Sequence, residues 1–496
     1  MNVLFLVPPE IHSIESSVPK GLESGKGIYP KLGLLYVAAY LEQHSPVQPR
    51  VLDANAEGLD YAAMEQRLRE LQPDLVGISV LTFNLIDAWK TARLIKRVRP
   101  SAKVCLGGQH VTLYPDETLA LEGVDFIVHG EGERTFARLV NALLEAQQSS
   151  PESAPPGLPE AALPEAALPE AALKEIPGLG FQGSEGPFRH PLQDRIEDLD
   201  SLPPPARHLV DQLSYDHVVA RGNRLTTMQT SRGCPAACLF CDIRKTQFRK
   251  RSPENVLAEL NSLLDQGIDD IFFVDDTITI DKRRVLELCE LIESNGRPFH
   301  FKISARVDTV NEDLLAALKR AGCYRIHYGV ESATPRLLKF LQKGQTPEKI
   351  RRAFRWTKAA GIGCFAYMMI GIPGETRAEM DETVRFAIEL DPDYVQFSIC
   401  TPYPKTALYD AMREQGIIPG DVWRDFAREP REDFRVRFWN SDFSEDELRT
   451  IQNDAHRRFY WRWKTISREL SRVRSWKGFK AKADLGAKII LRRLNR

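Results

Sequence analysis

The first 145 residues alternate short apolar runs with stretches in which apolar residues recur at helical spacing. The apolar runs cover residues 3–7, 51–54, 75–81, 104–108 and 125–130. Helical spacing separates them over residues 32–43, 61–71 and 86–98. Strands that alternate with helices form parallel sheets covered on both faces, and ligands lie beyond the carboxyl ends of such strands. The pattern therefore predicts an α/β domain with a doubly wound parallel sheet over residues 1–145.

A second alternation of the same kind runs from Leu225 to about Tyr409. Its apolar runs, each followed by a helical pattern, cover residues 225–231, 270–276, 301–307, 324–330, 364–371 and 394–400. Consecutive β/α units of this number favour a partial (β/α)6 barrel, whose active site lies at the C-terminal rim of the strands. We assign the barrel to residues 216–410 and a helical C-terminal region to residues 411–496.

A low-complexity segment separates the two alternating regions. The sequence LPEAALPEAALPEAALKE at residues 158–175 repeats with a five-residue period and carries Pro159, Pro164 and Pro169. Proline at this spacing prevents one continuous helix. We therefore assign residues 146–215 to a linker and give the repeat no function.

Composition bounds the class of protein. The chain has 496 residues, of which 43% are hydrophobic and 27% charged, so two or three folded domains are expected. It contains no run of 18 apolar residues, and its start, MNVLFLVPPE, lacks the basic and small-residue features of a signal peptide. These features predict a cytoplasmic protein.

Three cysteines, Cys234, Cys238 and Cys241, lie in the run GCPAACLFC directly after the first predicted barrel strand. Clusters of the 4Fe-4S type normally take four thiolates, so three predict a cluster with one iron open to another ligand. A zinc site would need a fourth Cys or His, and a disulfide is disfavoured in a reducing compartment. The remaining cysteines stand singly among apolar residues and are predicted to be core thiols: Cys105, Cys289, Cys323, Cys364 and Cys400.

The cysteine run at this position resembles the radical SAM superfamily, and the resemblance covers residues 220–410. It implies that the open iron binds S-adenosylmethionine (SAM), whose reductive cleavage yields a 5′-deoxyadenosyl radical. Phe240 matches the aromatic residue beside the last cysteine. The family often has Gly-Gly-Glu where this chain has VDDTI. Positions that resemble the family's SAM contacts are Asp275, Asp276, Ser304, Arg306, Glu331 and Gly371, although a strand-end Arg or Glu is also a common salt-bridge residue.

Two elements of the N-terminal region resemble cobalamin-binding domains. Ser79 and Leu81 match a Ser-x-Leu element, and Gly107 with Gly108 matches a Gly-Gly element that lets the backbone approach the ligand. The alternative is a generic doubly wound sheet in which this segment is only a core strand. The Asp-x-His-x-x-Gly signature, whose histidine ligates cobalt, is absent, and His12 is expected to be a solvent-exposed loop residue. The resemblance implies base-off cobalamin without a histidine ligand.

Together these resemblances identify a member of the cobalamin-dependent radical SAM enzymes, which include class B methyltransferases and proteins like the anaerobic magnesium-protoporphyrin ester cyclase. They imply a C-methyltransferase that uses a 4Fe-4S cluster, SAM and cobalamin to methylate an unactivated carbon of a hydrophobic or small-molecule intermediate. The alternative is a radical cyclase or C–C bond-forming enzyme acting on a tetrapyrrole or lipid without methyl transfer. A reductant such as flavodoxin or ferredoxin is implied, and the catalytic residue stays open.

The end of the chain is strongly basic although the net charge is −1. Residues 455–496 hold 14 Lys and Arg residues against Glu469 and Asp484. Aromatic residues alternate with these cations, namely Phe459, Tyr460, Trp461, Trp463 and Trp476. The pattern predicts either peripheral contact with an anionic membrane, on the inner face, or packing of a basic helix on an acidic body. No nucleic-acid partner is expected, because the tail contains no recognisable RNA-binding module.

Overall fold

The computed structural model describes residues 1–14, 28–149, 170–192, 195–211, 215, 224–436, 438, 440 and 442–471. Its first sheet has the strand order β2-β1-β3-β4-β5-β6-β7. The five parallel strands are β1 (Val3–Val7), β2 (Arg50–Asp53), β3 (Leu75–Ser79), β4 (Lys103–Gly107) and β5 (Phe126–Val128). Their order reverses between β1 and β3, which in doubly wound folds marks the ligand-binding crevice. The predicted doubly wound sheet is confirmed.

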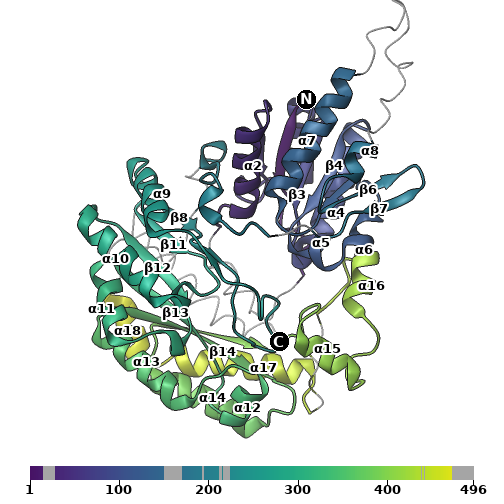
Figure 1. Cartoon of the computed structure of the whole chain (residues 1–496). Helices are drawn as coiled ribbons and strands as arrows, with labels where there is room; N and C mark the ends of the chain where they lie inside the picture. The colour runs from purple at the N-terminus through teal and green to yellow at the C-terminus, as the bar shows by residue number, and fades with distance from the viewer. Residues whose placement is uncertain are drawn as a thin grey trace, which may run out of the picture.

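Helices cover both faces of this sheet (Figure 1). On one face α2 (Leu32–His44) packs against α7 (Gly132–Ser149), and on the other α3 (Tyr61–Leu71) packs against α4 (Leu85–Val98). Two short helices follow β4, α5 (Gln109–Leu113) and α6 (Pro115–Leu119). The short loops at the carboxyl ends of β3 and β4 are thereby held between packed elements.

Part of the segment assigned to the linker belongs to this sheet. After α8 (Glu170–Lys174), strands β6 (Leu179–Gly183) and β7 (Gly186–Arg189) continue the sheet in antiparallel direction beyond β5. Phe181 is fully buried and pairs with Phe126. The assigned linker over 146–215 therefore includes two strands of the sheet that sequence reasoning missed, because two short strands rich in glycine carry little β-strand signal. The repeat over 158–169 lies outside the described residues.

The second sheet has the strand order β15-β14-β13-β12-β11-β8, with every pair parallel. Its strands are β8 (Leu225–Met228), β11 (Asp270–Phe273), β12 (His300–Ala305), β13 (Cys323–Glu331), β14 (Gly363–Ile370) and β15 (Tyr394–Ile399). The helices that cover its outer face are α9 (Pro253–Asp265), α10 (Lys282–Asn295), α11 (Glu312–Arg320), α12 (Pro335–Phe340), α13 (Pro347–Ala359) and α14 (Arg377–Leu390). β8 and β15 form the two edges, so the barrel is partial, as predicted.

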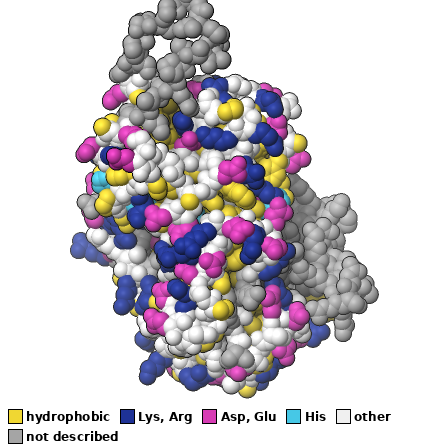
Figure 2. Space-filling view, turned by 90° about the vertical axis from the view of Figure 1, so that its right-hand side faces the viewer, with side chains coloured by type: hydrophobic (Ala, Val, Ile, Leu, Met, Phe, Trp, Pro, Cys, Tyr) yellow, Lys and Arg dark blue, Asp and Glu magenta, His cyan; other side chains and the backbone are white. Residues whose placement is uncertain are grey.

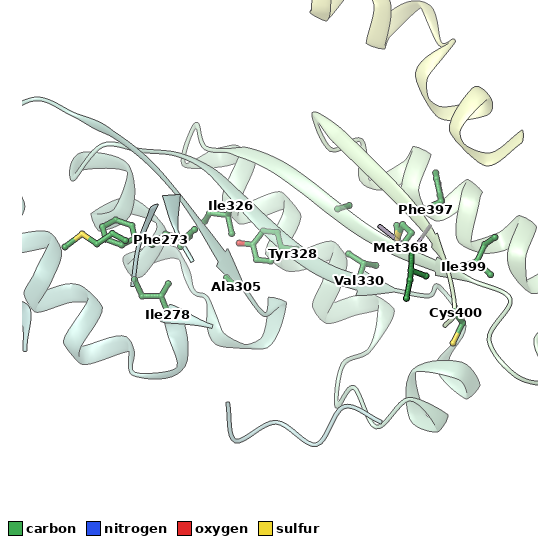
Figure 3. Packing of buried hydrophobic residues seen from close by; sticks show 14 of the residues in the cluster. Phe273, Ile278, Ala305, Ile326, Tyr328, Val330, Met368, Phe397, Ile399 and Cys400 are labelled. Atoms are coloured by element: carbon green, nitrogen blue, oxygen red, sulfur yellow. The ribbon is translucent and has the colours of Figure 1, made fainter. Parts of the chain in front are cut away.

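Burial alternates with a period of two residues along the last two barrel strands. In β14 and β15 every second side chain is buried and the others are half-buried. The buried set, including Phe273, Tyr328, Met368 and Phe397, packs between the sheet and its helices (Figure 3). The other set lines the inner face, which is therefore more open than the outer face.

The C-terminal region is helical, as expected: α15 (Ala407–Glu414), α16 (Val422–Arg428), α17 (Glu445–Tyr460) and α18 (Trp463–Ser471). Helix α17 protects the edge strand β15, because His456 Nε2 accepts a hydrogen bond from Phe397 N at 3.2 Å and Gln452 Nε2 donates to Phe397 O at 2.8 Å. No helix in the described part of the chain is long and apolar enough to span a membrane.

The described part of the basic tail packs on the barrel domain. Arg462, Lys464 and Arg468 all lie within ion-pair distance of Asp391, at 3.3, 2.9 and 3.5 Å. Trp461 and Trp463 are exposed, and Trp476 lies outside the described residues. Positive and negative side chains are interspersed on the face shown in Figure 2.

Candidate active site at the facing edges of the two domains

The three cysteines lie on a loop whose two ends are fixed to each other. Strands β9 (Ser231–Arg232) and β10 (Arg249–Lys250) pair antiparallel and close the loop. Inside it, Cys234 N donates a hydrogen bond to Thr246 Oγ1 at 2.8 Å, and Thr246 N donates to Cys234 O at 3.0 Å. Gly233 has a φ of +88°, and a Cβ there would lie 2.1 Å from Gln247 O. Only glycine fits this approach of the two loop ends.

The thiols of the three cysteines form one electrostatic group. Cys234 and Cys238 are buried, and Cys241 is half-buried. Burial raises the pKa of the Cys241 thiol to about 12, and the nearby Asp242, Cys238 and Cys234 add to the rise. Within the described residues, no three Cys, His, Asp or Glu side chains are placed to hold a single metal ion. The cysteine donors still suit an iron–sulfur cluster, whose thiolates are spread over several iron atoms instead of meeting at one.

Two cationic side chains lie beside Cys238, Arg306 at the end of β12 and Lys343 after α12. Arg306, at the end of β12, donates a hydrogen bond to Cys238 Sγ at 3.4 Å and another to Lys343 O at 2.6 Å. Lys343 Nζ forms a buried ion pair with Glu331 at 2.8 Å and lies 5.5 Å from the ring centroid of Phe240. Although burial lowers the pKa of Lys343, Glu331 and Cys238 outweigh it and raise that pKa. The two cations therefore bring positive charge beside Cys238, although Arg306 also pairs with Asp308 at 2.8 Å.

Glu331 adopts a strained backbone conformation at this place. Its φ is +68°, in the left-handed region, and it ends β13 at a register shift beside Gly329. A Cβ on Gly329 would lie 2.6 Å from Glu331 Oε1 and 2.8 Å from Lys343 Nζ. Strain of this kind costs about 1–3 kcal/mol and persists where surrounding contacts impose it. The left-handed backbone of Glu331 and the absence of a side chain at Gly329 together let the Glu331–Lys343 pair lie over the sheet.

Three of the predicted SAM contacts lie together in the structure. Phe240, Arg306 and Glu331 gather around the cysteine loop through Lys343, which sequence reasoning missed. Ser304 is half-buried two residues before Arg306 on β12. Their contacts with SAM stay predictions.

Asp275 and Asp276 differ in what they contact. Asp275 is buried and accepts hydrogen bonds from Thr230 N at 3.1 Å, from Thr230 Oγ1 at 2.8 Å and from Ser231 Oγ. It thus anchors the start of the cysteine loop. Asp276 is exposed and accepts a hydrogen bond from Gly233 N at 3.0 Å. Partial burial and the charges of Asp275 and Asp242 raise the Asp276 pKa, and its side chain is the more open of the two.

Gly371 lies at the end of β14, where its φ is +71° and a Cβ would lie 3.0 Å from Leu448 of α17. The turn that follows buries Glu375, whose Oε2 accepts a hydrogen bond from Ile372 N at 3.0 Å. Burial raises the Glu375 pKa to about 8. Gly371 thus allows close packing of the C-terminal helix against this turn, and a SAM contact of its backbone stays a prediction.

The N-terminal sheet presents a backbone cradle at the carboxyl ends of β3 and β4. Gly108 has a φ of +101°, and a Cβ there would lie 2.8 Å from Val80 O. Val80 N donates to Gly107 O at 2.7 Å, which joins the two strand ends. Ser79 is half-buried, and Leu81 is 43% exposed. The four predicted residues thus share one edge, where the missing side chains suit a large flat ligand such as cobalamin.

His110, two residues after Gly108, was not among the predicted residues. It is fully buried, its Nδ1 lies 3.1 Å from Thr82 Oγ1, and its Nε2 has no hydrogen-bond partner among the described residues. Burial lowers its pKa to about 3, so it is neutral at pH 7. The signal available in the sequence was a histidine two residues after the Gly-Gly pair.

His12 is not the solvent-exposed residue that the sequence suggested. Its Nδ1 lies 2.8 Å from Asp87, and its Nε2 lies 3.1 Å from Lys90 Nζ and 3.7 Å from Glu432. Asp87 is fully buried and also accepts a hydrogen bond from Tyr61. His12 therefore belongs to a charge cluster at the start of α4.

The cysteine loop and the N-terminal cradle contact each other. Gln109, at the start of α5, donates a hydrogen bond to Asp242, the residue after Cys241. Lys405 donates to Leu113 O, and the rings of Phe83 and Tyr403 meet edge to face at 5.5 Å. The two ligand-facing edges therefore lie next to each other, joined by contacts of the cysteine loop and of the segment after β15.

Two carboxylates of the N-terminal domain hold both ends of the cysteine loop. Glu133 accepts from Arg232 at 2.7 Å, and Glu131 accepts from Arg249 at 2.6 Å. Burial opposes the charge of Glu131, but Arg249 and Arg232 outweigh it and hold the Glu131 pKa below its usual range. The run GEGERT after β5 thus orients the loop toward the cradle.

Family models match both halves of this arrangement. The radical SAM superfamily model matches residues 228–387, and the B12 binding domain model matches residues 21–140. The chain is 32% identical to the uncharacterized methyltransferase PH0819 of Pyrococcus horikoshii, over 95% of each chain. The chain belongs to the cobalamin-dependent radical SAM enzymes. It therefore works with a 4Fe-4S cluster, SAM and cobalamin.

Other relatives of this enzyme carry different activities in their names. It is 28% identical to the anaerobic magnesium-protoporphyrin IX monomethyl ester cyclase of Cereibacter sphaeroides, over 84% of this chain and 64% of that protein. It is 27% identical to the cytidylyl-2-hydroxyethylphosphonate methyltransferase of Streptomyces wedmorensis, over 82% and 86%.

Solved structures share the fold. The cobalamin-dependent SAM radical enzyme OxsB, with aqua-cobalamin and SAM bound, has a TM-score of 0.70 at 17% identity and is matched by 99% of this chain over 72% of its own. The radical SAM methyltransferase TsrM of Kitasatospora setae has a TM-score of 0.63 at 21% identity, with coverage of 84% and 76%.

Proposed function

We propose that the enzyme methylates an unactivated carbon of a hydrophobic or small-molecule biosynthetic intermediate. The observation that carries the proposal is the contact between the cysteine loop and the N-terminal cradle through Gln109 and Asp242. When bound, SAM at the cluster supplies a radical that removes hydrogen, and cobalamin supplies a methyl group. Groups bordering one space would allow a substrate radical to be captured before it reacts with solvent.

The protein's own part in this reaction is to position groups and balance charge. Arg306 and Lys343 offset the charge of the thiolates, and Glu331 faces the same end of the barrel with a carboxylate. Asp276 keeps a carboxylate open beside the cysteine loop, where an amino group could bind. Gly107 and Gly108 leave the opposite wall without side chains.

Methyl transfer is supported by the methyltransferase names of PH0819 and of the Streptomyces protein. Radical cyclisation without methyl transfer is the second candidate, because the Cereibacter relative is a named cyclase. Both candidates need the same cofactors, so the fate of the SAM methyl group separates them.

The experiment uses the whole chain, reconstituted without oxygen with iron, sulfide and cobalamin, and SAM carrying a trideuteriomethyl group. A metabolite extract from the source organism serves as the substrate pool, and products are analysed by mass spectrometry. Methyl transfer predicts a product that gains the labelled methyl group, with S-adenosylhomocysteine and 5′-deoxyadenosine formed in equal amounts. Formation of 5′-deoxyadenosine with an unlabelled product would favour the cyclase.

The proposal includes a one-electron donor such as flavodoxin or ferredoxin, and contact of the basic tail with an anionic membrane. Exposure of 54% at Trp461 and 78% at Trp463 supports that contact, whereas the ion pairs of Asp391 support packing of the helix on the protein. Vesicles of anionic lipid should bind the full chain and bind a W461A/W463A variant less. Equal binding of both would remove membrane contact from the proposal.

A further inference from the structure

The inner face of the barrel sheet carries two buried cations well below the cysteine loop. Lys302 on β12 and Arg325 on β13 are register partners on adjacent strands. Lys302 is 1% exposed and Arg325 is 8% exposed. The proposed chemistry at the carboxyl ends of the strands uses neither residue.

Lys302 is surrounded by aromatic side chains. Its Nζ lies 4.8 Å from the ring centroid of Phe272 and 3.2 Å from the hydroxyl of Tyr29, which comes from the N-terminal domain. Burial lowers the Lys302 pKa to about 8. No carboxylate of the described residues lies within ion-pair distance of it, and Asp270 acts on it from further away. A buried ammonium without a carboxylate partner is costly, so this arrangement destabilises the protein on its own.

The N–H groups of the Arg325 side chain make no hydrogen bond to the described residues. The guanidinium lies 4.7 Å from the ring centroid of Tyr394 and 5.4 Å from that of Tyr324. Within the described part of the chain its side chain donates no hydrogen bond, and its buried Nε has no partner. A planar fork of N–H groups held flat by aromatic rings is suited to bind an oxyanion through two parallel hydrogen bonds.

The charges around the two cations do not balance. The charge of Asp270 opposes the lowering of the Lys302 pKa by burial. Asp270 also accepts a hydrogen bond from the Tyr324 hydroxyl at 3.2 Å. His327, two residues beyond Arg325, has its Nδ1 3.2 Å from the Tyr367 hydroxyl. Among the described residues Asp270 is the carboxylate that acts on Lys302, so two buried cations stand against one carboxylate, which leaves room for one further negative charge.

We propose that Lys302 and Arg325 bind an anionic group of the substrate, a carboxylate or a phosphate-type oxyanion. This inference deepens the proposed function by naming the substrate class. Lys302 precedes Arg306 by four residues on β12, so at about 3.3 Å per residue the anion lies roughly 13 Å from the cysteine loop. The reacting carbon is therefore separated from the anion by a body of about that length.

The side chains between the two ends indicate what this body is. His327 stacks on Phe365 with ring centroids 4.8 Å apart, and Phe365 lies 4.8 Å from Tyr367. Phe272 lies 5.4 Å from His327 and 6.1 Å from Tyr29. Aromatic faces on successive strands favour a flat or apolar body. The substrate class is thus an anion with a flat, apolar body that extends toward the cysteines.

The test measures binding to the reconstituted enzyme by calorimetry and needs no methylation. The probes are 3-phenylpropionate, 3-phenylpropylphosphonate and the neutral 3-phenylpropionamide. We expect at least one oxyanion to bind at least about tenfold more tightly than the amide. K302M and R325M should each lose about tenfold or more of that preference, and R325K should keep part of it. Exposed Lys349 and Arg283 provide the charge-matched controls K349M and R283M.

Thermal stability supplies a second readout. Because Lys302 has no carboxylate of the described residues at ion-pair distance, K302M should raise the melting temperature of the ligand-free enzyme while it weakens oxyanion binding. A merely structural lysine would give the opposite change in stability. Failure of both oxyanions to bind at millimolar concentration, or unchanged oxyanion binding in K302M and R325M, would overturn the inference. Absence of the labelled product in the experiment with trideuteriomethyl SAM, together with intact oxyanion binding, would instead contradict the proposed function. The probe that binds more tightly decides between a carboxylate and a phosphate-type group.

Discussion

The two edges that border the proposed active site differ in the kind of groups that they present. The N-terminal edge consists of backbone and small residues, with Gly107, Gly108 and a neutral buried His110. The barrel edge consists of charges, with Arg306 and the Glu331–Lys343 pair around three thiols. We expect the first edge to select by shape, since it has few side chains and offers hydrogen-bonding backbone. We expect the second to select by charge, since thiolates in a poorly solvated loop need compensating cations.

The two edges should therefore fail in different ways, and removing a cluster ligand should have the largest effect. In C238A two thiolates remain, which do not retain a 4Fe-4S cluster, so iron content and radical-dependent product should fall below detection while cobalamin still binds. Iron and sulfide analysis checks this result. C289A removes a buried thiol of the barrel core and should keep the cluster. An intact cluster in C238A would show that the ligands are misassigned.

The G108V substitution should disrupt the N-terminal edge. A side chain at a φ of +101° and 2.8 Å from Val80 O strains the backbone and fills the cradle. Strain of about 1–3 kcal/mol and the added bulk should lower cobalamin affinity at least tenfold, with the cluster retained. Cobalamin absorbance after gel filtration measures this. In G58V the φ is +66° but nothing lies within 4 Å, so the control isolates backbone strain. Equal loss in both variants would count against steric filling of the cradle.

The charged edge can be probed without removing a cysteine. K343M leaves Glu331 buried without its partner, which should cost about 3 kcal/mol of barrel stability and weaken SAM binding. The double variant E331Q/K343M should recover much of the stability, because no buried charge is left uncompensated. Thermal unfolding and equilibrium SAM binding measure the two effects. If K343M and the double variant were equally unstable, the pair would not act through charge.

His110 gives the smallest effect, through the pH dependence of stability. Its pKa is about 3 in the folded protein and ordinarily about 6.5, so the unfolded chain binds more protons below pH 6.5. The stability that neutral, buried His110 allows is fully present above about pH 6.5, and it is lost as the pH falls toward about 3. Between about pH 7 and pH 5 the loss is about 2 kcal/mol. H110N should unfold at a temperature that depends less on pH, whereas H300N, at an exposed site, should behave like the unchanged enzyme.

Much of this architecture could be predicted from the sequence, because periodic burial leaves a periodic pattern. The five N-terminal parallel strands and the six barrel strands lie where apolar runs predicted them. Strands β6 and β7 could not be predicted, because their glycines interrupt the pattern and their burial depends on Phe126, far away in sequence. The predicted site likewise omitted residues that act through distant partners. Lys343 meets Glu331 across a loop, and Arg232 meets Glu133 from another domain, so no local motif marks either contact.

The most direct test is electron paramagnetic resonance of the reduced enzyme that contains both the cluster and cobalamin. If the two edges border one space, the paramagnetic cluster and the paramagnetic cob(II)alamin are close enough to broaden or split each other's signals. C238A loaded with cobalamin and G108V loaded with the cluster provide the isolated signals. We predict that the spectrum of the complete enzyme differs from the sum of these two spectra. A spectrum equal to that sum, with both groups present at full occupancy, would contradict it.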